Sequence, residues 1–189
     1  MRFVETELPG AFLVELEVSY DHRGFFARTW CGDEFSAHGL NPHLAQCNLS
    51  YNGKRGTLRG LHYQVTPHSE AKLVQCTAGS LFDVIVDLRP DSPHRGRWRS
   101  FELSNRGRRA LYVPEGFAHG FQTLEDDTEV LYHVSAPFHP ESARGLRWND
   151  PVIDISWPIA DPVISDRDRS HPLLVAPLDG RAATQSVLG

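Results

Sequence analysis

An all-β fold, built as a sandwich or barrel of short strands, is what the sequence predicts. Short runs rich in β-branched and aromatic residues recur along the chain, and turn signals such as Asn52-Gly53 and Ala78-Gly79 fall between them. The clearest runs are residues 14–18, 81–88, 109–113 and 129–134. Many short strands separated by regular turn signals are typical of sandwiches and barrels.

The individual elements follow from local pattern. Residues 14–18 alternate apolar and acidic side chains with period two, which is the pattern of a half-buried strand. A short helix is expected at 33–38, with Asp33 as its N-cap and Gly39 as its C-terminal stop. Prolines at 158, 162, 172 and 177 exclude regular strands there, so about 158–189 is expected to form an extended C-terminal arm. No linker divides the chain, and residues 1–189 are predicted to form one domain.

Composition excludes several classes of function. The net charge is −5 and the basic residues are scattered, so neither nucleic acid nor a membrane surface is an expected partner. Three cysteines without a C-x2-C pair form neither a disulfide framework nor a zinc ribbon. The N-terminus has no apolar signal core. The chain is expected to be a cytoplasmic protein.

A metal-site pattern of cupin β-barrels is present in outline but lacks ligands. That pattern reads G-x5-H-x-H-x3,4-E-x6-G, followed by G-x5-P-x-G-x2-H-x3-N. Gly56, His62 and His119 keep its frame, whereas Gln64 replaces the second histidine and Lys72 the glutamate. Because a lysine cation repels a metal ion, no metal is expected, and the pocket should handle an anion or an enolate. A metal-dependent cupin, either an oxygenase or an isomerase, remains the less favoured alternative.

Five motifs carry a resemblance to a known family. They are Asp21-His-Arg23-Gly24-Phe-Phe26, Gly56-x-Leu58-Arg59-Gly60-Leu61-His62-Tyr63-Gln64, Lys72-Leu-Val74, Pro114-x-Gly116-x-Ala118-His119-Gly120-Phe121 and Ser165-Asp-Arg-Asp168. In this order they resemble the dTDP-4-dehydrorhamnose 3,5-epimerase family, whose fold is a cupin-type jelly roll. The resemblance implies removal of protons beside the C4 ketone of a dTDP-4-keto-6-deoxy sugar, with inversion at C3 and C5 and without a cofactor.

The catalytic residues come from the same resemblance. It implies that His62 is the base. An imidazole suits this role, because its unperturbed pKa of about 6.5 lies close to the operating pH. Asp168, 106 positions further on, would pair with His62 and stabilise the imidazolium (168 − 62 = 106). Tyr132 would return a proton to the opposite face of the sugar.

The substrate-contact residues are also implied by the family. Lys72 would stabilise enolate charge, and His119 either shares that task or forms a hydrogen bond in the core. Arg23 and Arg59 match a diphosphate clamp, since guanidinium groups fit phosphate oxygens well. The other substrate contacts implied are Phe26, Gln46, Asn48 and Phe138.

Departures from the family pattern leave alternatives open. Phe138 stands where the family has a second tyrosine, and His133 follows Tyr132 where the family has lysine. A single epimerisation, at C3 or at C5, of a related nucleotide sugar is therefore an alternative. A sugar-binding module is disfavoured because His62, Asp168 and Tyr132 are all present. The family further implies a homodimer that exchanges N-terminal strands, which the sequence alone supports weakly.

Overall fold

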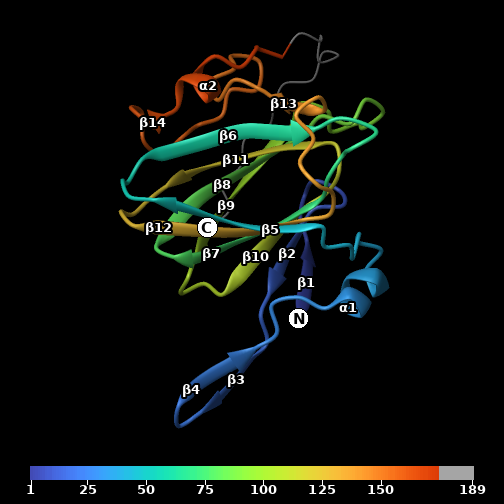
Figure 1. Cartoon of the computed structure of the whole chain (residues 1–189), viewed down its shortest axis with the longest axis vertical. Coiled ribbons are helices and arrows are strands. Elements are labelled where there is room, and N and C mark those ends of the chain that lie inside the picture. Colours follow the sequence, from blue (N-terminus) through green and yellow to red (C-terminus); the bar gives the residue numbers. More distant parts are fainter. Residues whose placement is uncertain (175–189) are drawn as a thin grey trace.

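The computed structural model describes residues 1–174 and has the all-β architecture that the sequence predicts. Two sheets face each other, and a separate two-stranded hairpin extends away from them (Figure 1). The first sheet contains, in spatial order, β1 (Arg2–Glu5), β2 (Phe12–Glu15), β10 (Arg109–Val113), β7 (Lys72–Ala78), β12 (Thr128–Val134) and β5 (Gln46–Asn52). The second contains β13 (Ala143–Gly145), β6 (Thr57–Gln64), β11 (Phe117–Thr123), β8 (Ser80–Asp87) and β9 (Trp98–Ser104), with β14 (Val163–Ile164) parallel to β6.

The main core lies between the sheets. Side chains of alternating strand residues meet there, among them the fully buried Leu81, Ile85, Leu103, Leu111 and Val130. A second apolar cluster covers the other face of β8, so all eight residues of this strand are buried. Burial on both faces explains why the run predicted at 81–88 has little alternation.

The N-terminal elements differ in detail from the prediction. The strand predicted at 14–18 is split, because the chain leaves the first sheet after β2 and begins β3 (Val18–Asp21), which pairs with β4 (Gly24–Ala27). Helix α1 spans Gly32–Ala37, and its N-cap is Cys31 rather than Asp33, which lies in the first turn. Gly39 follows the helix with a φ of 70°, a left-handed conformation that suits a helix stop.

The described part of the C-terminal arm, residues 158–174, runs beside β6 (Figure 1). The expectation that prolines exclude any strand there is wrong for β14, because Val163 follows Pro162 and its own amide donates to the Gly56 carbonyl at 2.9 Å. A short helix, α2 (Asp166–Arg169), comes next and was not predicted. The rest of the predicted arm, including Pro177, lies outside the described residues. Among residues 1–174, no helix is long and apolar enough to cross a membrane.

Candidate functional site

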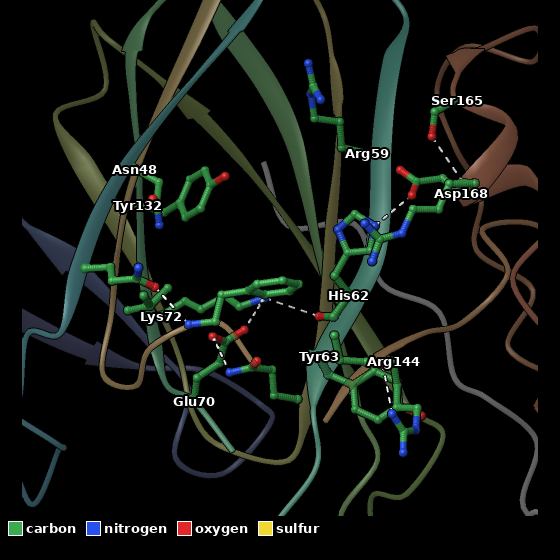
Figure 2. Close-up of a pocket in the computed structure, with 16 residues that line it drawn as sticks. Asn48, Arg59, His62, Tyr63, Glu70, Lys72, Tyr132, Arg144, Ser165 and Asp168 are labelled. Atoms are coloured by element: carbon green, nitrogen blue, oxygen red, sulfur yellow. Dashed lines mark hydrogen bonds and ion pairs between the residues drawn. The ribbon is translucent and has the colours of Figure 1, made fainter. Parts of the chain in front are cut away.

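A cavity of about 450 Å³ opens between the two sheets. One wall is β6 with the α2 segment, and the other is formed by β5, β7 and β12 (Figure 2). Residues two apart on a strand face the same side, and this places Gln46 and Asn48 on β5, and Tyr132 and Val134 on β12, against the cavity. The described residues that line it are Gln46, Asn48, Arg59, His62, Tyr63, Gln64, Glu70, Lys72, Tyr132, Val134, Phe138, Ala143, Arg144, Ser165, Arg167 and Asp168.

His62 and Asp168 meet on the β6 wall. His62 Nε2 lies 2.8 Å from Asp168 Oδ1, and the Gly60 amide donates to Oδ2 at 3.1 Å. Ser165 caps α2 by accepting a hydrogen bond from the Asp168 amide, which fixes the aspartate at the start of the helix. Burial would raise the pKa of Asp168, but the hydrogen bonds from His62 and Gly60 outweigh it and hold this pKa below its ordinary value. Asp168 is therefore an ionised, fixed partner for the imidazole.

The orientation of His62 leaves one ring nitrogen available. With Nε2–H donated to the carboxylate, the lone pair stays on Nδ1. The side chain is 40% exposed, whereas Asp168 is 7% exposed. The imidazole can therefore meet a ligand in the cavity while its partner is shielded from water.

Tyr132 lies on the opposite wall from His62 (Figure 2). Its strand pairs Tyr132 with Asn48 on β5 and with Val74 on β7. A ligand held in the cavity would thus have an imidazole on one side and a phenol on the other. Gln46 accepts a hydrogen bond from the Phe138 amide at 2.9 Å, which ties β5 to the loop that carries Phe138.

Lys72 is a partly neutralised cation at the end of the cavity. Its Nζ lies 3.2 Å from Glu70 Oε1 and donates to the His62 carbonyl at 3.3 Å, and both charged side chains are only 11% exposed. Gln64 donates to Glu70 Oε2 at 3.1 Å. Lys72 and Gln64 stand where the cupin pattern has metal ligands, and Glu70 contacts both of them. Glu70 was not predicted as a site residue from the sequence.

The cavity favours an anionic ligand. Within the described part of the chain, four cationic side chains line it, against the two carboxylates of Glu70 and Asp168. Arg59 is held in place because its Nε donates to the buried Asn52 Oδ1 at 2.8 Å. The other three cations are Lys72, Arg144 and Arg167. Guanidinium groups in such a position match phosphate oxygens.

His119 lies outside the cavity lining. Its Nε2 is 2.9 Å from Asp83 Oδ1 and 3.0 Å from Oδ2, and both side chains are buried. Of the two expectations for His119, this geometry favours hydrogen bonding in the core over contact with substrate.

Arg23 and Phe26 lie on the β3–β4 hairpin, away from the cavity of their own chain (Figure 1). Arg23 is 78% exposed and forms an ion pair with Asp21 at 2.5 Å. Phe26 is 77% exposed. The structure therefore does not bring these two predicted substrate contacts to the site within one chain.

Several lining residues were missed from sequence. Glu70 stands two positions before Lys72, and Tyr63 lies inside the motif that supplied His62. Position beside a known site residue was the available signal for both. Arg144 had no such signal, because β13 reaches the site by pairing with β6.

Among residues 1–174, two groups of side chains could hold a divalent cation on distance alone. They are His62 with Asp168 and His171, and His68 with His139 and Glu141; within each group the candidate ligand atoms lie within 4.8 Å of one another. The second group lies outside the cavity lining. Neither group includes Gln64 or Lys72, which stand where the cupin pattern has metal ligands. These groups therefore do not test whether a metal binds at those positions, and its expected absence stays a prediction.

Comparison with known proteins gives consistent matches. The sequence profile described as dTDP-4-dehydrorhamnose 3,5-epimerase matches residues 5–176. The dTDP-4-dehydrorhamnose 3,5-epimerase of Sinorhizobium fredii is 46% identical over 155 residues, which is 82% of this chain and 80% of the relative. The crystal structure of the Bacillus anthracis enzyme of that name, with TDP and PPi bound, superposes with a TM-score of 0.89 at 42% identity, covering 92% of this chain and 99% of the other. The fold agreement confirms the predicted cupin-type jelly roll.

A second similar structure belongs to an enzyme of different activity. It is a 3′-monoepimerase from Streptomyces bikiniensis in complex with dTDP-quinovose. Its TM-score is 0.83 at 32% identity, covering 89% of this chain and 85% of the other.

Proposed function

The chain belongs to the dTDP-4-dehydrorhamnose 3,5-epimerase family, and on that premise we propose that it inverts C3 and C5 of a dTDP-4-keto-6-deoxyhexose. It is an isomerase. The observation that carries the proposed mechanism is the cavity with the His62–Asp168 pair on one wall and Tyr132 on the other. Inversion at a carbon needs this arrangement, because the proton must leave from one face and return to the other.

The reaction follows from the acidity of hydrogens beside a ketone. Nδ1 of His62 takes the proton from C3 or C5, and the electrons of the broken C–H bond move into an enolate on the C4 oxygen. Asp168 stabilises the imidazolium through the bond at Nε2. The phenol of Tyr132 then gives its proton to the opposite face of the carbon, and the ketone re-forms. Each inversion leaves His62 protonated and Tyr132 as a phenolate, and proton exchange with water restores both before the next one. Protons and electrons then balance without an oxidant or a reductant.

Lys72 is proposed to stabilise the enolate. Its ammonium group lines the cavity, and Glu70 and the His62 carbonyl hold it in place. A charge that is fixed before the reaction needs no reorganisation when the oxyanion forms. Arg59 is proposed to bind the diphosphate, with Gln46, Asn48 and Phe138 contacting the rest of the substrate.

A homodimer would give Arg23 and Phe26 a role. The β3–β4 hairpin extends from the sandwich and exposes the aromatic residues Tyr20, Phe25 and Phe26 at 68%, 52% and 77%. Exposed aromatic side chains on a projecting element are typical of a surface that binds a partner. We propose that the hairpin packs on a second copy and brings Arg23 and Phe26 to that copy's cavity. A cytoplasmic location stays a prediction.

A single epimerisation is the second candidate. It is favoured by Phe138, which lines the cavity without the hydroxyl of the family tyrosine, and by the similarity to a 3′-monoepimerase. Both candidates use the same base and the same chemistry, and they differ in whether one carbon or two are presented to His62.

Incubation with dTDP-4-keto-6-deoxyglucose in D2O, followed by proton NMR, tests the proposal. We expect loss of the C3 and C5 signals and a product inverted at both carbons, in chelator-treated enzyme as in untreated enzyme. Exchange and inversion at one carbon would establish the single epimerase instead. Activity that disappears on chelation and returns with a transition metal would contradict the mechanism.

A further inference from the structure

His171 lies beside the catalytic pair, and neither the sequence motifs nor the mechanism above use it. Its Nε2 is 3.5 Å from Asp168 Oδ1, the same oxygen that His62 contacts at 2.8 Å. The rings of His171 and His62 meet edge to face, with centroids 5.6 Å apart. The side chain is only 13% exposed. One carboxylate oxygen is therefore flanked by two imidazoles, one facing the cavity and one buried.

The ring of His171 occupies space that is free only because residue 145 is a glycine and has no Cβ. It lies against Gly145 of β13, where an added Cβ would overlap three atoms of the imidazole. Gly145 is the residue paired with His62 across β13 and β6. The same strand pairing that positions His62 thus also provides the space for His171.

The backbone around His171 is fixed independently of its ring. Arg147 Nε donates to the His171 carbonyl at 2.8 Å, and the Arg147 amide donates to the Pro172 carbonyl at 2.9 Å. Leu174 donates its amide to Asp150 Oδ2 at 2.5 Å. Because these contacts already hold residues 171–174, attachment of this segment does not require an imidazole. The ring nitrogen Nε2 is buried and forms no hydrogen bond among residues 1–174, and the carboxylate oxygen it approaches is Asp168 Oδ1, at 3.5 Å.

His171 is electrically neutral at neutral pH. Burial lowers its pKa, and the nearby His62 lowers it further, against the opposing effect of Asp168. The charged or titratable groups that face it are Asp168 and Arg167 on α2, His62 on β6, and Arg147 after β13. A neutral imidazole covers the carboxylate without competing for its charge.

We propose that His171 is a positioning residue, whose neutral imidazole closes the outer side of Asp168 and holds Oδ1 toward His62. Without the ring, water would reach Oδ1, and the carboxylate could turn away from the catalytic histidine. This inference rests on the proposed function, since it assigns His171 a part in the same proton abstraction.

Four variants separate this role from simple packing. His171→Gln keeps a donor at the Nε2 position, whereas His171→Leu fills the space without one. Gly145→Ala leaves His171 intact but displaces its ring. His43→Gln, at an exposed loop position outside the cavity lining, is the matched control. For each, kcat and KM for C3 and C5 exchange in D2O are measured per folded protein, with the folded fraction taken from circular dichroism.

We expect His171→Leu and Gly145→Ala to lower kcat by roughly 10-fold to 100-fold, as small misplacements of catalytic groups do, with KM unchanged. His171→Gln should recover most of the loss, and His43→Gln should match the wild type. Equal kcat in Gln and Leu variants, or wild-type kcat in Gly145→Ala, would overturn the proposal. If Leu fails to fold, the Gln and Gly145→Ala results decide. A wild type that exchanges no hydrogen would instead refute the proposed function.

Discussion

Two histidine–aspartate pairs have their histidines on neighbouring strands of the second sheet, and the pairs differ in what surrounds them. His62 on β6 is paired in register with His119 on β11. The nitrogen–oxygen distances to their carboxylates are almost the same, 2.8 Å for His62–Asp168 and 2.9 Å for His119–Asp83. The His62 side chain is 40% exposed to the cavity, whereas His119 is 9% exposed and Asp83 is fully buried.

The environment gives the two carboxylates opposite behaviour. Hydrogen bonds from His62 and Gly60 overcome burial and lower the pKa of Asp168, while complete burial raises the pKa of Asp83 despite His119. The His62 pair is open to a ligand in the cavity, and the His119 pair is enclosed by protein. Access and solvation, rather than the kind of residue pair, therefore distinguish a catalytic unit from a structural one.

The largest expected difference is in catalysis. His62→Ala should lower C3 and C5 hydrogen exchange by roughly 10² to 10⁴, which is the usual contribution of a positioned base. Deuterium incorporation followed by NMR measures it, with the urea unfolding midpoint as a control for folding. Exchange at the wild-type rate would move the base elsewhere.

His119 should show its effect in stability. His119→Leu leaves the buried Asp83 carboxylate unpaired, which costs about 3–5 kcal/mol when one member of a buried pair is removed. Urea unfolding of both histidine variants makes the comparison direct, since His62→Ala should be affected less. If His119→Leu is as stable as the wild type and has lost exchange, the functional assignment of the two pairs is reversed.

Arg59 tests binding apart from proton transfer. Arg59→Ala should raise KM, because each lost charged hydrogen bond is worth about 1.5–3 kcal/mol, while the fold is retained. Titration calorimetry with dTDP provides the measurement, and Arg55→Ala, outside the cavity lining, is the control. Affinity equal to that of the wild type would return Arg59 to a structural role, through its bond to Asn52.

The smallest expected effect is a dependence of stability on pH. Burial lowers the pKa of His133 and of His171, so below pH ~6.5 the unfolded chain binds more protons at these positions than the folded chain does. Their contribution to stability is present in full above that pH and declines as the pH falls. The urea midpoint should be lower at pH 5.5 than at pH 7.5, and the difference should shrink in His133→Asn. If the difference in urea midpoint between the two pH values is the same in His133→Asn as in the wild type, the pH dependence comes from other groups.

Sequence reasoning located the parts of the site that lie in continuous motifs. His62, Lys72 and Tyr132 are strand residues whose facing follows from period two, and all three line the cavity. Asp168 was placed with His62 only by family resemblance, because nothing local indicates that α2 returns to β6. Arg23 and Phe26 lie away from this cavity because the hairpin leaves the sandwich. Glu70 stands two positions before Lys72 and His171 three positions after Asp168, so nearness to a predicted site residue was an available signal for both that was not used.

One measurement tests the proposed two-wall mechanism most directly. Tyr132→Phe removes the phenol hydroxyl and keeps the ring, so packing is preserved. In D2O, His62 should still remove protons and return deuterons to its own face. We expect exchange at C3 and C5 to persist while net inversion falls much further. Exchange and inversion that fall by the same factor, or an inversion rate equal to that of the wild type, would contradict the assignment of Tyr132 as the acid on the opposite wall.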